Sequence, residues 1–114
     1  MLVAGSSEAR DVQSWVAEQE PLCTSSVCWY EFVTGPVDER GIRIVQSVIH
    51  NRIVPFSAEQ AAVSARLFNA TGRMRRTRID AMIAAASIDT GSTLATRNRS
   101  DFKIFGEHGL RLLG

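Results

Sequence analysis

Apolar positions recur along the chain with two different periods. Over residues 7–20 and 42–49 they are spaced three or four positions apart, which predicts amphipathic helices. The same spacing predicts a helix over residues 77–90. Short apolar or β-branched runs predict strands at residues 22–24, 52–56, 93–96 and 110–113. Strands that alternate with helices indicate an α/β fold with a parallel sheet covered by helices.

Capping residues mark where two further helices begin. Ser25 or Ser26 is suited to cap a helix over residues 27–33. Ser57 followed by Gln60 is a capping-box pattern, and it predicts a helix that ends near Gly72. The face of this helix that we expect to be buried has three apolar residues: Ala61, Ala65 and Phe68.

The length of 114 residues is typical of one domain, and we expect a single domain over residues 1–114. No apolar run approaches the roughly 18 residues that would span a membrane, and the first residues do not resemble a secretion signal. The two cysteines, Cys23 and Cys28, are too few for a disulfide scaffold. These features favour a cytoplasmic protein without a membrane partner.

The net charge of +1 conceals an asymmetry between two parts of the chain. Residues 1–39 contain seven acidic residues and one arginine, whereas residues 40–114 contain twelve basic residues and five acidic ones. Six arginines surround two of the acids discussed below: Arg73, Arg75, Arg76, Arg78, Arg97 and Arg99. Their planar guanidinium groups suit phosphate, so the cluster favours binding of an RNA backbone, the alternative being a solvated charged face.

Three carboxylates follow predicted strands along the chain. Glu31 lies in an apolar helical run, Asp80 in the first turn of the helix over residues 77–90, and Asp101 five residues after a strand. In a parallel sheet they could converge at the carboxyl edge, where ligands bind. Grouped carboxylates repel one another unless a cation lies among them, and their hard oxygens suit Mg²⁺ or Mn²⁺. Singly, Asp80 could complement the helix dipole, Asp101 could cap a turn, and Glu31 could point into solvent.

The order of two motifs narrows these alternatives. Asp80-Ala81-Met82-Ile83-Ala84-Ala85 precedes Thr96-Arg97-Asn98-Arg99-Ser100-Asp101-Phe102, and both follow a segment that contains Glu31. In this order the segments resemble the PIN-domain family, and most closely the VapC-type toxins of bacterial toxin–antitoxin pairs. The resemblance covers nearly the whole chain.

The resemblance implies a Rossmann-like fold and a ribonuclease that depends on Mg²⁺ or Mn²⁺. It assigns catalytic and metal-binding roles to Glu31, Asp80 and Asp101, and places Thr96 and Asn98 along the same site. It also implies a homodimer and inhibition by a cognate VapB-type antitoxin.

The chain departs from the family pattern at its beginning. Family members open with a hydrophobic central strand that ends in a metal-binding aspartate, whereas this sequence has no acid before Glu8. We therefore expect the first strand to be missing or truncated, because the natural chain starts upstream or because the site is a degenerate copy.

Three functions follow as hypotheses. The first is a metal-dependent endoribonuclease toxin that cleaves RNA with metal-activated water. The second is a catalytically impaired PIN domain that serves as an antitoxin-binding or dimerising module. The third is a basic module that binds nucleic acid without chemistry.

Overall fold

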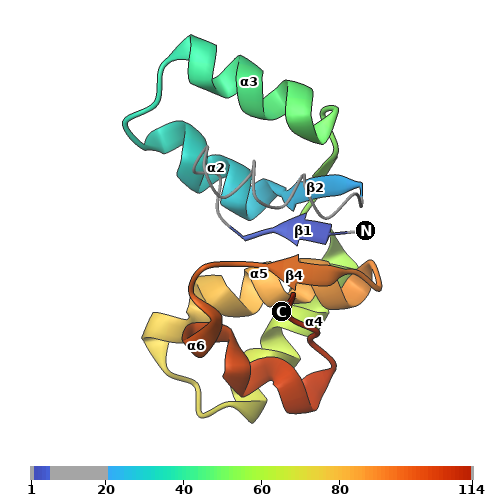
Figure 1. Cartoon of the computed structure of the whole chain (residues 1–114). Coiled ribbons are helices and arrows are strands. Elements are labelled where there is room, and N and C mark those ends of the chain that lie inside the picture. Colours follow the sequence, from blue (N-terminus) through green and yellow to red (C-terminus); the bar gives the residue numbers. More distant parts are fainter. Residues whose placement is uncertain (1, 6–20, 114) are drawn as a thin grey trace.

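The computed structural model describes residues 2–5 and 21–113 (Figure 1). The strands are β1 (Leu2–Ala4), β2 (Leu22–Ser25), β3 (Ile53–Val54) and β4 (Thr93–Ala95). The α-helices are α2 (Ser26–Thr34), α3 (Glu39–Ile49), α4 (Ala58–Ala70), α5 (Arg78–Asp89) and α6 (Arg99–Phe102). Two 3-10 helices are η1 (Arg75–Thr77) and η2 (Lys103–His108). The helix predicted over residues 7–20 lies outside the described residues.

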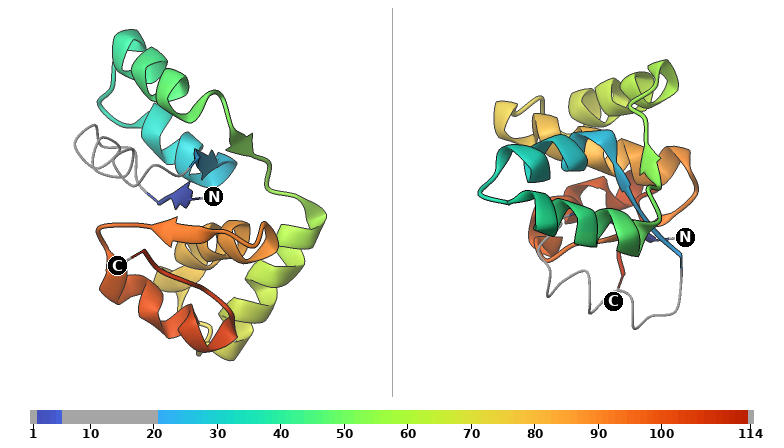
Figure 2. Two further views of the ribbon diagram at one scale, coloured as in Figure 1. Left: turned by 45° about the vertical axis from the view of Figure 1, so that its right-hand side comes forward. Right: turned by 90° about the horizontal axis from the view of Figure 1, so that it is seen from above.

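The strands form one parallel sheet in the order β3-β2-β1-β4, which confirms the predicted α/β class. Figures 1 and 2 show α3 and α4 on opposite sides of these strands. The strand expected at residues 110–113 is reduced to a single parallel bridge between Leu94 and Leu112. No helix within the described residues is long and apolar enough to cross a membrane.

Of the two alternatives expected for the first strand, missing or truncated, the first is wrong, because a strand of three residues is present. β1 lies in the middle of the sheet and pairs in register with β2 on one side and β4 on the other. Leu2, Val3 and Ala4 are each at most 1% exposed, and the hydroxyl of Thr24 donates to the Ala4 carbonyl at 3.0 Å. Three residues suffice here because neighbouring strands satisfy the backbone groups on both sides. Its end has no acidic residue, as the sequence indicates, since Ala4 and Gly5 stand there.

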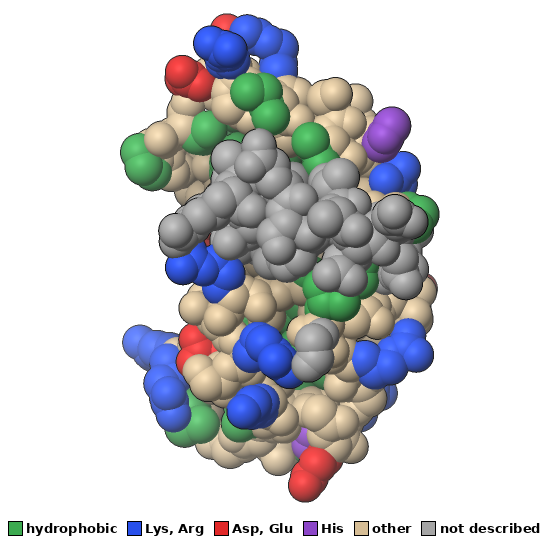
Figure 3. Space-filling view, in the orientation of Figure 1, with side chains coloured by type: hydrophobic (Ala, Val, Ile, Leu, Met, Phe, Trp, Pro, Cys, Tyr) green, Lys and Arg blue, Asp and Glu red, His purple; other side chains and the backbone are tan. Residues whose placement is uncertain are grey.

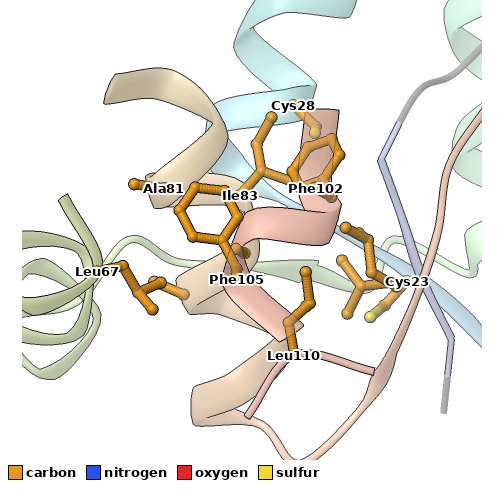
Figure 4. Close-up of a cluster of buried hydrophobic side chains, with 12 residues drawn as sticks. Cys23, Cys28, Leu67, Ala81, Ile83, Phe102, Phe105 and Leu110 are labelled. Carbon is orange, nitrogen blue, oxygen red and sulfur yellow. The ribbon is translucent and has the colours of Figure 1, made fainter. Parts of the chain in front are cut away.

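Alternation along β1 divides the core between the two faces of the sheet. Val3 packs with α4, α5 and the C-terminal helices around Phe105, and Figure 4 shows part of this cluster. Leu2 and Ala4 point to the other face, where they pack with Ile49 at the end of α3. Both faces of the sheet are therefore covered, as the apolar sequence of β1 requires.

The predicted caps are confirmed at two helices. The Ser25 hydroxyl accepts a hydrogen bond from the Cys28 amide at 3.1 Å, and the Ser57 hydroxyl accepts one from the Gln60 amide at 3.1 Å. The buried face predicted for α4 is partly wrong. Its buried residues are Gln60, Ser64 and Leu67; Phe68 is half-buried, and Ala61 and Ala65 are exposed. Ser64 can be buried because its hydroxyl donates to the Gln60 carbonyl at 2.7 Å.

Candidate active site

The three predicted carboxylates lie on segments that gather at the carboxyl edge of the sheet. The strands β1, β2 and β4 point to the same side of the molecule, where α6 and the start of α5 are found (Figure 1). Glu31 belongs to α2, Asp80 to the first turn of α5, and Asp101 to α6. Asp80 is half-buried, whereas Glu31 and Asp101 are exposed.

The electrostatics of Asp80 indicate that Glu31 and Asp101 each lie within interaction range of it. Burial raises the pKa of the Asp80 carboxyl above its ordinary value, and the negative charges of Asp101 and Glu31 raise it further. The acids therefore form a shared negative site with Asp80 at its more buried end. Their roles in catalysis and metal binding stay predictions.

The carboxylates available here suit a divalent ion that keeps several water ligands better than a cation whose ligands all come from protein. No three carboxylate, thiol or imidazole groups in the described parts of the chain are arranged to hold one ion together. Mg²⁺ is commonly bound through one or two carboxylates and keeps several waters, and a cation would relieve the repulsion that raises the pKa of Asp80. Asp80 with one of its acidic neighbours is therefore a chemically suitable pair of ligands.

The end of β1 is closely packed. The Gly5 amide donates to the Ala95 carbonyl at 2.8 Å, and a Cβ at Gly5 would lie 3.2 Å from both the Ala95 oxygen and the Thr96 Cβ. The Cys28 thiol donates to the Gly5 carbonyl at 3.5 Å. A side chain at position 5 would thus start beside Thr96, close to the edge where the acids gather.

Cys28 is a neighbour of the acids that sequence reasoning did not connect with them. Its pKa is raised to about 11, chiefly by burial and also by the charges of Glu31 and Asp80. The group is therefore a neutral thiol near neutral pH and is not an activated nucleophile. The sequence holds no signal for this contact, because it depends on how α2 packs against the end of β1.

Thr96 and Asn98 shape the turn that leads from β4 into α6. The buried hydroxyl of Thr96 accepts a hydrogen bond from the Asn98 amide at 3.1 Å, and the Asn98 carbonyl accepts one from the Asp101 amide at 3.0 Å. These two bonds fix the backbone that presents Asp101. The exposed Asn98 side chain lies at the start of this helix, where the resemblance predicts a site-lining residue.

The predicted phosphate-binding arginines fall into two groups, both exposed. Arg73, Arg75, Arg76 and Arg78 occupy the link before α5, η1 and the first residue of α5, whereas Arg97 and Arg99 lie at the start of α6. Figure 3 shows basic side chains on both sides of an acidic one on the half of the molecule that contains α6. Exposed arginines therefore flank Asp80 and Asp101 along the chain, and an acid on this face has basic neighbours, which suits a phosphate backbone drawn towards a cation.

Comparison with known proteins agrees with this architecture. A family model described as PIN domain matches residues 1–107. The comparison with curated proteins finds no relative.

Several solved structures share the fold at low sequence identity. FitAcB from Neisseria gonorrhoeae is 17% identical, with a TM-score of 0.71 over 100% of this chain and 97% of that one. A toxin-antitoxin complex from Klebsiella pneumoniae is 18% identical, with a TM-score of 0.70 over 90% and 91% of the two chains. VapBC-1 from nontypeable Haemophilus influenzae is 15% identical, with a TM-score of 0.67 over 99% and 97%. At these identities the likeness establishes the fold.

Proposed function

The chain belongs to the PIN-domain family, whose members are generally nucleases, and from this premise we propose that it is a VapC-type toxin that cleaves RNA with Mg²⁺ or Mn²⁺. The observation that supports the proposal most directly is that Glu31, Asp80 and Asp101 belong to segments that meet at one sheet edge, where burial and the charges of Asp101 and Glu31 raise the pKa of Asp80. A basic margin beside these acids suits an RNA substrate.

Each polar side chain has a role in this proposal. Asp80 would hold the metal together with one of its acidic neighbours, Glu31 or Asp101, and these two neighbours would orient the attacking water. The bound ion would supply a more acidic water and charge neutralisation at the leaving oxygen. Arg73, Arg75, Arg76, Arg78, Arg97 and Arg99 bind phosphates on either side of the cleaved bond, and Thr96 and Asn98 line the site. Attack of water on phosphorus with cleavage of the P–O3′ bond would leave a 5′-phosphate and a 3′-hydroxyl.

The partners proposed are a VapB-type antitoxin and a second copy of this chain. Three structures of similar fold are described as toxin–antitoxin complexes or as VapBC assemblies, which supports an antitoxin partner. Tyr30, Val33 and Ile44 on α2 and α3 are 69%, 42% and 51% exposed, so these helices offer apolar surface to a partner. The proposed compartment is the cytoplasm, where both the RNA and the antitoxin would be met.

One observation favours a second candidate function. Ala4 and Gly5 at the end of the central strand provide no carboxylate, and no three ligands in the described residues hold an ion together. A PIN domain with a weakened metal site could persist as an antitoxin-binding or dimerising module. It would bind its partner tightly and leave RNA intact at high Mn²⁺ concentration.

Cleavage of a labelled RNA with Mn²⁺ by the wild type, Asp80→Asn and Asp89→Asn distinguishes the two functions. Asp89 is a matched control because it lies in the same helix, nine residues and about 13 Å further along. The nuclease proposal expects Asp80→Asn to lose at least about 100-fold in rate, at the low end of what a positioned acid–base group contributes, and Asp89→Asn to keep the wild-type rate. Equal rates for all three proteins would refute it.

A further inference from the structure

Two of the arginines before Asp80 converge on one aromatic ring. The guanidinium carbon of Arg73 lies 5.4 Å from the centroid of the Phe68 ring, and that of Arg78 lies 5.5 Å from it. The arginines come from different elements, the turn after α4 and the first residue of α5. The ring itself is half-buried and packs against the main core cluster. Phe68 therefore fixes two cations relative to the core.

The position of Arg73 is specified by its backbone as well as its side chain. Its φ of 57° is left-handed, which is uncommon for a residue other than glycine. The Arg73 amide donates to the Phe68 carbonyl at 3.0 Å, and its guanidinium donates to the side-chain oxygen of Asn69. Three separate interactions thus direct this side chain towards Phe68, so it differs from an arginine that merely solvates the surface.

Among the residues that the structure describes, an ion pair joins Arg43 and Glu39. In the same part of the chain, no acid neutralises the guanidinium group of Arg73 or Arg78. Two positive charges held at one ring repel each other and create a field that attracts an anion. The two arginines of η1 are exposed as well, so the pair belongs to a segment with four arginines in six positions. A ligand with several negative charges in a row would therefore meet several cations there.

We propose that Phe68 is a positioning residue that holds Arg73 and Arg78 as a pair for one phosphodiester group of the RNA substrate, at a distance from the group that is cleaved. The inference rests on the proposed nuclease function. A phosphodiester suits the pair because each planar guanidinium can donate two hydrogen bonds to phosphate oxygens. RNA is favoured over an acidic protein segment because the four arginines of residues 73–78 form one exposed basic segment, and guanidinium groups pair most favourably with the oxygens of a phosphate backbone.

The test uses Phe68→Leu, which removes the ring but keeps an apolar side chain, and Phe68→Tyr, which keeps the ring. Binding of a labelled single-stranded oligouridylate is measured in EDTA over a range of salt concentrations, so that cleavage does not interfere. Loss of one phosphate contact should reduce the slope of log affinity against log salt by about 0.7. We expect Phe68→Leu to show this smaller slope and to bind the oligouridylate up to about fivefold more weakly than the wild type. Phe68→Tyr should show the slope and the affinity of the wild type.

Kinetics with Mn²⁺ give a second readout that a purely structural role would not produce. Phe68→Leu should raise KM about fivefold and leave kcat unchanged, because the pair binds a phosphate that does not react. Asn69→Ala, at an exposed position, should change KM in the same direction by loosening Arg73. If Phe68→Leu lacks the cooperative thermal transition of the wild type, it is not folded, and the KM of Asn69→Ala then tests the proposal.

The outcomes separate this inference from the function on which it rests. A wild type that binds RNA without cleaving it, with a lower salt slope in the Phe68→Leu or Asn69→Ala variant, would support the arginine pair and refute the nuclease. Unchanged salt slope and KM in folded variants of an active enzyme would overturn the pair alone. Weaker binding of polyglutamate with unchanged binding of RNA would also overturn it, in favour of an acidic protein ligand.

Discussion

The strands β1 and β4 are paired neighbours with buried last residues but different ends. They pair in register from Leu2 with Thr93 to Ala4 with Ala95, and their last two residues are buried in each case. β4 leads into a turn with Thr96 and then Asp101, whereas β1 leads into Gly5 without a polar side chain. The comparison shows that the fold and the candidate site depend on different properties of a strand. Pairing within the sheet requires only a backbone and small apolar side chains, whereas an active site requires a particular polar side chain at the end of the strand.

The largest effect on stability is expected from a substitution in the buried part of β4. Leu94 is fully buried in β4, and Leu94→Ala should lower the free energy of unfolding by about 2–5 kcal/mol through lost packing and a cavity. Urea unfolding measures the change. Ile104→Ala, at a position 40% exposed, is the control and should change stability by no more than about 0.5 kcal/mol. Equal losses in the two variants would show that β4 does not depend on its packing.

An acidic residue after β1 tests whether the end of this strand contributes to RNA cleavage. Gly5→Asp should increase the rate of RNA cleavage with Mn²⁺ by about tenfold, which corresponds to about 1.4 kcal/mol in the barrier. Gly5→Ala is the matched control, because its Cβ meets the Ala95 oxygen and Thr96 at the same 3.2 Å without adding a carboxylate. Both variants should lose similar stability. An equal rate in both would contradict the separation between fold and site.

A smaller effect should reveal what holds the end of β1 in place. Thr24→Val keeps the side-chain shape and removes the buried hydrogen bond to the Ala4 carbonyl, at a cost of about 0.5–1.5 kcal/mol. Thr34→Val removes an exposed hydroxyl that donates to the Glu31 carbonyl at 3.1 Å, and should cost less. Chemical denaturation compares them. A greater loss for Thr34→Val would show that the Thr24 bond does not anchor the strand.

The smallest effect concerns the charge of the site. The raised pKa of Asp80 means that the folded protein holds this proton more readily than the unfolded chain. The resulting stabilisation is complete below the unfolded-state pKa and is lost as the pH rises through the raised pKa. Asp80→Asn should therefore be more stable than the wild type at pH 7, by less than about 1 kcal/mol because solvent screens a half-exposed group.

Thermal unfolding at two pH values measures this difference. At about pH 3, below the ordinary pKa of aspartate, the advantage of Asp80→Asn should disappear. An advantage of the same size at both pH values would assign the effect to packing instead of charge. Mn²⁺ should raise the melting temperature of the wild type more than that of the variant, since binding to the folded state stabilises it.

The sequence predicted elements with strong local signals and failed where structure depends on distant partners. β2 and α5 were predictable from an apolar run and a regular stripe with a cap or turn beside them. β1 was not, because three apolar residues followed by Gly5 become a strand only when β2 and β4 pair with them. On α4 the alanines suggested a buried face, but Gln60 and Ser64 occupy it because hydrogen bonds satisfy the Ser64 hydroxyl and the Gln60 amide nitrogen.

The site shows the same division. Glu31, Asp80 and Asp101 could be named from motifs and from the rule that ligands bind beyond the carboxyl ends of strands. The contact of the Cys28 thiol with Gly5 and the two arginines at Phe68 could not, since they depend on side-chain packing between elements. Residue types therefore indicated which polar groups the sheet edge would offer, while the contacts between elements became visible only in three dimensions.

The outer margins of the sheet bear on how this protein can self-associate. β4 is an outermost strand, but the Leu94 amide donates to the Arg111 carbonyl at 2.8 Å and the Leu94 carbonyl accepts from the Leu113 amide at 2.9 Å. β3, at the opposite margin, has only two residues. An open strand is a template for intermolecular pairing and aggregation, and both margins offer little of one. Copies of this chain should therefore meet through helices, and the sheet should not grow from one molecule into the next.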